Sequence, residues 1–200
     1  NEDKVLQSTE INNSVLESII NKCNNTSIHI SLFHADEWFV PTLDFWAKRE
    51  INNTKVVPEL KPPTEVLKSW KQEGKGGHKI MCMGEDTEID YLYHALEKEH
   101  ANDIHLYRSK STYIEISHRS ISKKTAIETL INICYPHIAM HEVVAFGDNY
   151  NDVEMLKSVG LGIAVANANE AVLKIAKRVT DTNKNDGVAK ALSDLFKLSH

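Results

Sequence analysis

The sequence has few cysteines and no surplus of positive charge. Its three cysteines, Cys23, Cys82 and Cys134, lie far apart among 200 residues and form no Cys-x-x-Cys pair. A disulfide framework and a cysteine zinc site are therefore excluded, and we expect the thiols to be reduced and buried. The formal net charge of −5 provides no basic surface for a phosphate backbone, so we do not expect nucleic acid as a partner.

Long hydrophobic runs are also absent. No stretch approaches the roughly 20 apolar residues of a membrane span. The first residues, 1–4, are polar where a signal peptide would have an apolar core. We therefore expect no membrane partner and a cytoplasmic location. The strings GxSxG, GxxxxGK[ST] and GxGxxG do not occur, so a serine hydrolase, an NTPase and a dinucleotide site have no starting point here.

The composition is that of a folded globular chain, since 42% of the residues are hydrophobic and 26% are charged. Disorder, collagen and a coiled coil are thereby excluded. In the first half we predict helices after Asn12 or Asn13, at 64–72 and at 85–99, and strands at 27–34, 37–40, 79–83, 104–107 and 113–116. This α+β order predicts a largely antiparallel sheet that is covered on one side.

The second half alternates strictly between helices and short apolar strands. We predict helices at 123–134, 152–159, 170–177 and 187–196, and strands at 143–146, 161–166 and 178–180. Strict alternation predicts a doubly wound parallel sheet, with a boundary to the first half near 117–121.

The strand at 143–146 leads into Gly147 and Asp148. Asp148 should therefore lie at the carboxyl end of a parallel strand, where open α/β sheets bind their ligands. We expect Asn151 to cap the next helix, whose free N–H groups would favour an anion, while Asp148 offers the hard oxygen ligand that Mg²⁺ prefers. The alternative is a purely structural role, in which these residues form a simple turn followed by a helix cap.

Two lysines occupy the first turn of the helix at 123–134. Lys123 and Lys124 follow a predicted cap, Ser122, and each cation there opposes the helix dipole by about 0.3–1 kcal/mol. An anionic ligand at the same sheet edge would offset this cost. A solvated lysine pair at an exposed helix start is the alternative.

Three stretches of the second half follow one another in a specific order: FGDNYNDVEML, GLGIAVANANEAVLKIA and RVTDTNKNDGVAKAL. Over residues 113–196, with the entry IEISHRSISKKTAI, the chain resembles the C-terminal half of Cof-type hydrolases of the haloacid dehalogenase superfamily. The preceding hundred residues are similar to that family's α/β cap domain in length and element order. The resemblance implies a doubly wound α/β core with an inserted α/β cap. It divides the chain into a core remnant at 1–11, the cap at 12–117 and the C-terminal half of the core at 118–200.

The resemblance also implies an activity and a set of roles. The activity is Mg²⁺-dependent hydrolysis of a small phosphorylated metabolite, such as a sugar phosphate, by way of a phosphoaspartate. Asp148 matches the family's metal-binding aspartate, and Asn151 matches a phosphate contact. Lys123 matches the lysine that holds the phosphate and the nucleophile. Asp152 matches the acidic residue that supports the metal or the lysine.

One departure from the family pattern is large. The sequence has no apolar strand that ends in Asp-x-Asp, the motif that supplies the family's nucleophile and its acid/base. We therefore expect that residues upstream were lost, that this chain alone is inactive, and that the absent strand would lie beside the strand at 143–146. The alternative is a non-catalytic remnant of the fold that binds a phosphate ligand or a partner.

Overall fold

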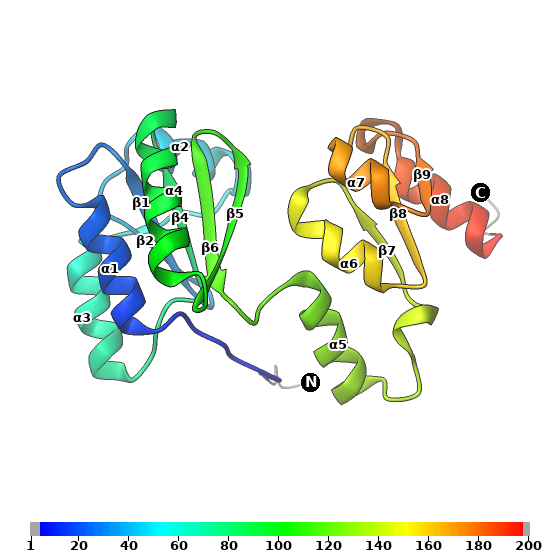
Figure 1. Ribbon diagram of the computed structural model, residues 1–200, viewed down its shortest axis with the longest axis horizontal. Helices are drawn as coiled ribbons and strands as arrows, with labels where there is room; N and C mark the ends of the chain where they lie inside the picture. Colours follow the sequence, from blue (N-terminus) through cyan, green and yellow to red (C-terminus); the bar gives the residue numbers. More distant parts are fainter. Residues whose placement is uncertain (1–4, 198–200) are drawn as a thin grey trace. The chain divides into compact units, whose positions relative to one another are not determined.

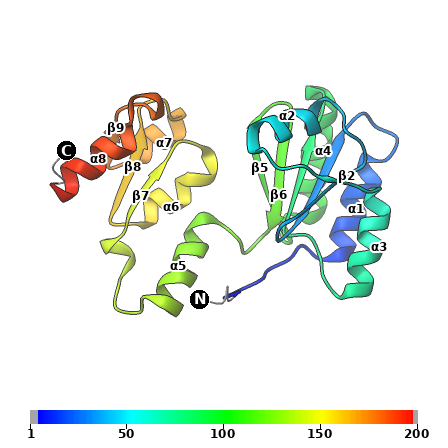
Figure 2. The ribbon, with the colours of Figure 1, turned by 180° about the vertical axis from the view of Figure 1, so that it is seen from behind.

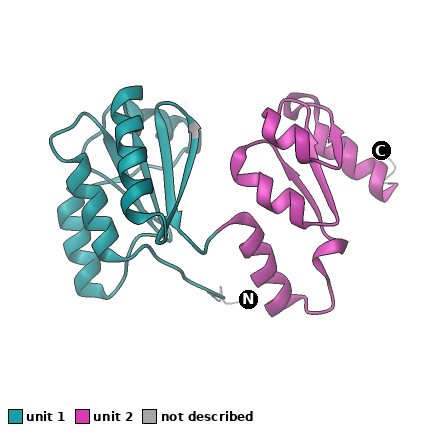
Figure 3. Cartoon of the chain, viewed as in Figure 1, with its two compact units in different colours: residues 1–121 teal, residues 122–200 magenta. Residues whose placement is uncertain are grey.

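The computed structural model describes residues 5–197, and the chain divides into two compact units, Asn1–Ile121 and Ser122–His200 (Figure 3). The polar start at 1–4 and the last three residues of the predicted core half lie outside the described residues. The units divide after Ile121, at the end of the range 117–121 predicted for the boundary. The last strand of unit 1 continues to His118, and a turn follows in which Ile121 N donates to His118 O over 2.9 Å.

Unit 1 is built on a six-stranded sheet with the strand order β3-β2-β1-β4-β6-β5 (Figure 1). The strands are β1 (His29–His34), β2 (Glu37–Val40), β3 (Glu59–Leu60), β4 (Lys79–Met83), β5 (Ile104–Lys110) and β6 (Tyr113–His118). All neighbours are antiparallel except β2 and β3, which confirms the predicted character of the sheet.

Three helices cover one face of this sheet: α1 (Asn13–Cys23), α3 (Pro63–Glu73) and α4 (Asp86–His100). Asn12 caps α1 by accepting a hydrogen bond from Ser14 N, and Gly74 ends α3 in a left-handed conformation with φ of 69°. Alternate residues of β1 point to opposite faces, so Ile30 and Leu32 join these helices in the main core.

The other face of the sheet is covered as well, and the prediction of a sheet covered on one side was wrong. A further helix, α2 (Phe45–Thr54), lies on this face, as Figure 2 shows from behind. It packs through Ala47 on Trp38 and Val40. Only Ala47 is buried in α2, and Ile51 one turn later is partly buried, so the apolar stripe is too short for a sequence pattern to reveal.

Unit 2 follows the predicted alternation of helices and strands. Its elements are α5 (Lys123–Cys134), β7 (Val144–Gly147), α6 (Val153–Ser158), β8 (Leu161–Val165), α7 (Glu170–Ile175), β9 (Arg178–Thr180) and α8 (Gly187–Phe196). The three strands form a parallel sheet in the order β7-β8-β9, which confirms the predicted parallel arrangement. Apolar residues of α6, β8 and α7 form its core, among them Leu156, Ala164 and Val172.

The cysteines agree only in part with the expectation of buried thiols. Cys23 and Cys82 are buried in unit 1, where their Sγ atoms lie 4.0 Å apart. Cys134 is exposed, because it ends α5, a helix with no buried residue. Within residues 5–197, no helix has both the length and the apolar character that crossing a membrane requires.

Candidate functional site

The polar side chains singled out in the sequence gather at the carboxyl end of β7. This strand ends at Gly147, and the chain turns through Asp148 and Asn149 into a 3₁₀ turn at Tyr150–Asp152. A Cβ atom on Gly147 would lie only 2.5 Å from Cβ of Asp152. Glycine at this position therefore allows the Asp152 side chain to fold back beneath the turn.

Asp152 is the centre of the site, with 2% of its surface exposed. Its Oδ2 accepts hydrogen bonds from the backbone N–H groups of Asp148, at 2.9 Å, and Asn149, at 3.1 Å. Its Oδ1 accepts a bond of 2.5 Å from Lys123 Nζ. Burial alone would raise the pKa of Asp152, but these hydrogen bonds outweigh burial and lower the pKa below its usual range. The carboxylate is therefore ionised when it holds the lysine.

Lys123 reaches Asp152 from the first turn of α5. Ser122 caps this helix by accepting from Thr125 N at 3.2 Å, as predicted. The Lys123 side chain is 49% exposed, so its ammonium group can also contact a ligand from the solvent side. Asp152 is itself an anion that offsets the unfavourable position of Lys123 near the helix N-terminus. The lysine therefore does not require a ligand to explain its place.

Lys124 is held differently. Its Nζ lies 3.2 Å from Oε1 of Glu128 and 3.9 Å from Oε1 of Glu154. These are ordinary surface ion pairs, the first at the i,i+4 spacing of a helix. Only the first lysine of the pair therefore belongs to the site.

Asn151 does not cap the next helix, so that prediction was wrong. The chain first forms the 3₁₀ turn, which Asn149 caps by accepting from Tyr150 N at 2.8 Å. Asn151 lies inside this turn, and α6 begins only at Val153. The physical reason is the return of Asp152 to the amides before it, which requires the tighter turn.

The expected free N–H groups at this helix start are also not available. The amides of Asp148 and Asn149 donate to Asp152, and the amide of Asp152 donates to Asn149 O at 2.9 Å. With Tyr150 N also bonded, the N–H groups of Asp148, Asn149, Tyr150 and Asp152 are all used within the loop. An anion here would rely on side chains, of which Lys123 is the charged one.

Two asparagines that the sequence analysis did not assign to the site support the loop. Asn169 N donates to the carbonyl oxygen of Asp148 at 3.0 Å, and Asn169 Nδ2 donates to Asn149 Oδ1 at 3.1 Å. Asn169 also caps α7 by accepting from Val172 N. Its position just before a predicted helix signals a cap, but the contact across to the β7 loop has no sequence signal.

The oxygen atoms around the loop fit a hard cation. The Asp148 side chain is exposed at the edge of the sheet, and Asn151 Oδ1 is buried without a hydrogen-bond partner. Carboxylate and amide oxygens suit Mg²⁺, and an unpaired buried acceptor is uncommon unless water or an ion satisfies it. The residues present are therefore compatible with the magnesium site that the resemblance implies.

Comparison with known proteins gives a family match over most of the chain. Residues 1–192 match the family described as haloacid dehalogenase-like hydrolase. A relative from Haemophilus influenzae is 36% identical over 151 residues, which is 76% of this chain and 53% of the relative. The 5-amino-6-(5-phospho-D-ribitylamino)uracil phosphatase of Bacillus subtilis is 35% identical over 132 residues, which is 64% of this chain and 52% of the enzyme.

A solved structure shares the fold. The subclass IIB sugar phosphatase BT4131 superimposes with a TM-score of 0.81 over 98% of this chain and 71% of its own, at 18% sequence identity. This likeness shows that the fold is that of the haloacid dehalogenase enzymes. The chain spans about half the length of the curated relatives it matches.

Proposed function

The chain belongs to the haloacid dehalogenase-like hydrolases, and we propose that it provides the cap and the C-terminal half of the core of a Mg²⁺-dependent phosphatase. The substrate class would be a small phosphorylated metabolite such as a sugar phosphate. The names of the two phosphatases described above support this class, since one acts on a phosphorylated ribityl compound and the other on sugar phosphates.

The observation that carries the proposal is the bond between Lys123 and Asp152 at the carboxyl end of β7. The buried carboxylate fixes the direction of the ammonium group, while the exposed half of the lysine side chain stays open to a ligand. In this proposal Lys123 offsets the negative charge of the transferring phosphoryl group. Asp152 acts through the lysine and through the loop that carries Asp148.

Mg²⁺ would be held by Asp148, and Asn151, whose buried Oδ1 has no hydrogen-bond partner, would contact the phosphate. When bound, the cation supplies positive charge that neutralises the phosphate oxygens. The nucleophile would be an aspartate outside this chain, because no strand of this sequence ends in Asp-x-Asp. Its carboxylate would attack phosphorus and release the alcohol, and water would then hydrolyse the acyl phosphate.

The test compares this chain with the longer reading frame that contains it, using an aryl phosphate and Mg²⁺. We expect negligible turnover by the 200-residue chain and turnover by a longer form that carries the Asp-x-Asp strand. In that form, Lys123→Ala should lower kcat about 10²- to 10³-fold. Lys124→Ala, one residue away and paired on the surface, is the matched control and should leave kcat unchanged.

Three results would contradict the proposal or part of it. One is equal activity of the Lys123→Ala and Lys124→Ala variants. Another is a start codon at this point of the gene with no upstream strand, which would favour a non-catalytic role in binding a phosphate ligand or a partner. Turnover by the 200-residue chain that is lost on Asp148→Ala would show that the nucleophile had been misassigned.

A further inference from the structure

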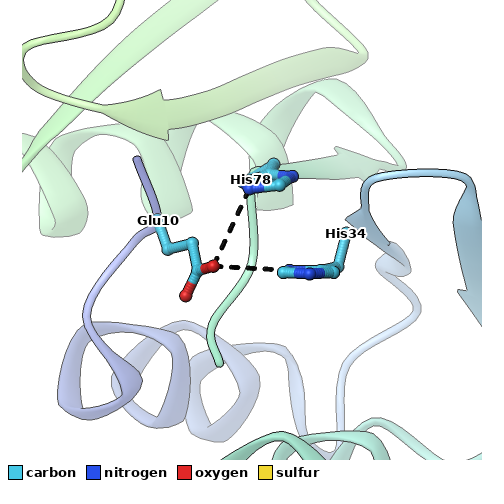
Figure 4. Close-up of side chains that lie close together, drawn as sticks. All are labelled: Glu10, His34 and His78. Carbon is cyan, nitrogen blue, oxygen red and sulfur yellow. Dashed lines mark ion pairs between the residues drawn. The ribbon is translucent and has the colours of Figure 1, made fainter. Parts of the chain in front are cut away.

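A second group of titratable side chains belongs to unit 1. Glu10 precedes α1, His34 ends β1, and His78 precedes β4 (Figure 4). Oε1 of Glu10 lies 3.8 Å from His34 Nδ1 and 3.8 Å from His78 Nε2. Two imidazoles and one carboxylate at such distances are a donor set that zinc uses in proteins.

The hydrogen bonds of the two rings exclude this use. His34 Nδ1 lies 2.7 Å from the carbonyl oxygen of Gly76, which can only accept, so this nitrogen carries a proton. His78 Nδ1 accepts from Ala35 N at 2.9 Å, so the proton of the neutral ring is on Nε2 and points to Ser8 Oγ at 2.8 Å. Both nitrogens that face the carboxylate are therefore protonated, and neither offers a lone pair to a metal.

The hydrogen bonds of this group connect the segment 8–11 to the rest of unit 1. Besides the contact from Ser8 to His78, Glu10 Oε2 accepts from Gly76 N at 2.6 Å, and Ile11 N donates to Gly77 O at 2.8 Å. A Cβ atom on Gly76 would lie 2.6 Å from the carbonyl oxygen of Ile11, so the two backbones are in close contact. This segment is the route by which the chain enters the first helix of the unit.

We propose that Glu10, His34 and His78 form a proton-operated clasp, which fastens residues 8–11 to unit 1 while His78 is neutral and loosens them when His78 takes up a proton. A protonated ring carries N–H groups at both nitrogens, so Nδ1 would face the N–H of Ala35, donor against donor. The ring must then leave Ala35. Glu10 Oε1 already lies 3.8 Å from His78 Nε2, so the charged ring would move toward it, and this movement would compete with the bond that Glu10 Oε2 accepts from Gly76 N.

The surroundings of His78 favour its neutral state. The charged and titratable groups are Glu10, the stacked ring of His34 at 4.4 Å, and the Glu37–Lys75 ion pair of 2.8 Å beside His34. Burial, and then the neighbouring His34, lower the pKa of His78, while Glu10 acts in the opposite direction. A lowered pKa in the folded state means that the clasp stabilises the unit above the unfolded value of about 6.5. That stability is lost as the pH falls through the folded pKa.

The test measures imidazole protonation and amide exchange by NMR in the 200-residue chain, from about pH 7.5 to about pH 4.5. At neutral pH, nitrogen shifts should show the proton of His78 on Nε2 and that of His34 on Nδ1. As His78 titrates, the protection factors of the Ala35 and Ile11 amides should fall together by about fivefold to tenfold, the effect of losing one hydrogen bond. Amides of β4 should keep their protection, which separates opening of the clasp from unfolding.

A non-titrating variant makes the test specific. In His78→Asn, the amide oxygen occupies the place of Nδ1, so it can accept from Ala35 N but takes up no proton in this range. Protection of Ala35 should then be independent of pH. His94 lies on α4, and its side chain is 65% exposed. The His94→Asn variant should therefore behave as the unchanged chain does.

Three outcomes would overturn the proposal. The first is a protection factor of Ala35 that does not follow the titration of His78. The second is equal pH dependence in the chain and in His78→Asn. The third is stoichiometric Zn²⁺ binding at micromolar concentration that His78→Asn removes, because this would show that the ring nitrogens are free to coordinate a metal.

Discussion

Units 1 and 2 use their helices in different ways. In unit 1, α1, α3 and α4 all bury an apolar stripe, and Leu16 and Leu96 have no exposed surface. In unit 2, the longest helix, α5, buries no residue, and its Leu130 and Ile133 are 45% and 52% exposed. Unit 1 is thus held by a core that its own elements close. Unit 2 has a smaller core, and polar contacts of the Asp152 network fix the loop at its sheet edge.

Matched core truncations are the most severe test of this comparison. Leu16→Ala in unit 1 and Leu156→Ala in unit 2 each remove a side chain with no exposed surface, and each should cost about 2–5 kcal/mol. We expect each loss to stay within its own unit. All three tryptophans, Trp38, Trp46 and Trp70, lie in unit 1, so their fluorescence during urea denaturation reports on that unit alone.

The contrasting variant supplies the control. The tryptophan transition should move to lower urea in Leu16→Ala and stay in place in Leu156→Ala, while the amides of β8 should show the reverse. A common shift of both signals by either variant would mean that the units unfold as one, and that the separate cores described here do not act separately.

Hydrogen exchange tests the strands of the two units. β4 is paired on both edges, with β1 and β6, whereas within residues 5–197 β7 is paired only with β8. Amides at 143–146 should therefore exchange much faster than those at 79–83, by about a hundredfold or roughly 3 kcal/mol in opening free energy. Equal, strong protection of both strands in a monomer would contradict the expected position of a further strand beside β7.

A buried polar chain in unit 1 gives a smaller effect. His29 Nδ1 lies 2.7 Å from Asp44 Oδ2, and its Nε2 lies 2.8 Å from Ser31 Oγ, which also accepts from Trp38 Nε1. The order Asp–His–Ser is that of a hydrolase triad. Ser31 is fully buried, however, so these hydrogen bonds serve to fix α2 to the sheet. His29→Ala should cost about 1–3 kcal/mol, because it removes a buried ring together with its bonds to Asp44 and Ser31.

The control for this prediction is His94→Ala, at an exposed position of α4, which should change stability by less than about 0.5 kcal/mol. Tryptophan fluorescence again gives the measurement. Equal midpoints for the two variants would show that the polar chain contributes nothing to the packing of α2.

The sequence allows most of unit 2 to be predicted because its elements are regular. The helix at 123–134 and the strand at 178–180 have the predicted bounds, since apolar periodicity and the Ser122 cap act locally. The missed helix, α2, has a single buried residue, and the bond between Asp44 and His29 helps to hold the helix on the sheet. Such a bond depends on how segments far apart in the sequence align in space. The apolar periodicity of one segment carries no information about that alignment.

The candidate site, like the fold, has some features that local sequence patterns predict and others that they do not. The meeting of Lys123 with Asp152 is consistent with the family resemblance, but the direction of Asp152 toward the amides behind it is not a local property. For the same reason Asn151 was misplaced as a helix cap. Asn169 shows the limit most clearly, because its capping role can be read from position and its bond to Asn149 cannot.

The smallest expected effect concerns the charge of Asp152. Asp152→Asn keeps the shape and one acceptor but loses the charged partner of Lys123, so unit 2 should lose about 1–2 kcal/mol at neutral pH. Asp148→Asn, in the same loop but exposed, should change stability by less than about 0.5 kcal/mol.

Because the pKa of Asp152 is lowered in the folded chain, its contribution to stability is complete above the unfolded pKa of about 3.9 and is lost as the pH falls through the folded pKa. The Asp152→Asn variant and the unchanged chain should therefore converge in acid, with β8 amides as the probe. A difference that persists in acid would assign the effect to packing and not to the carboxylate charge.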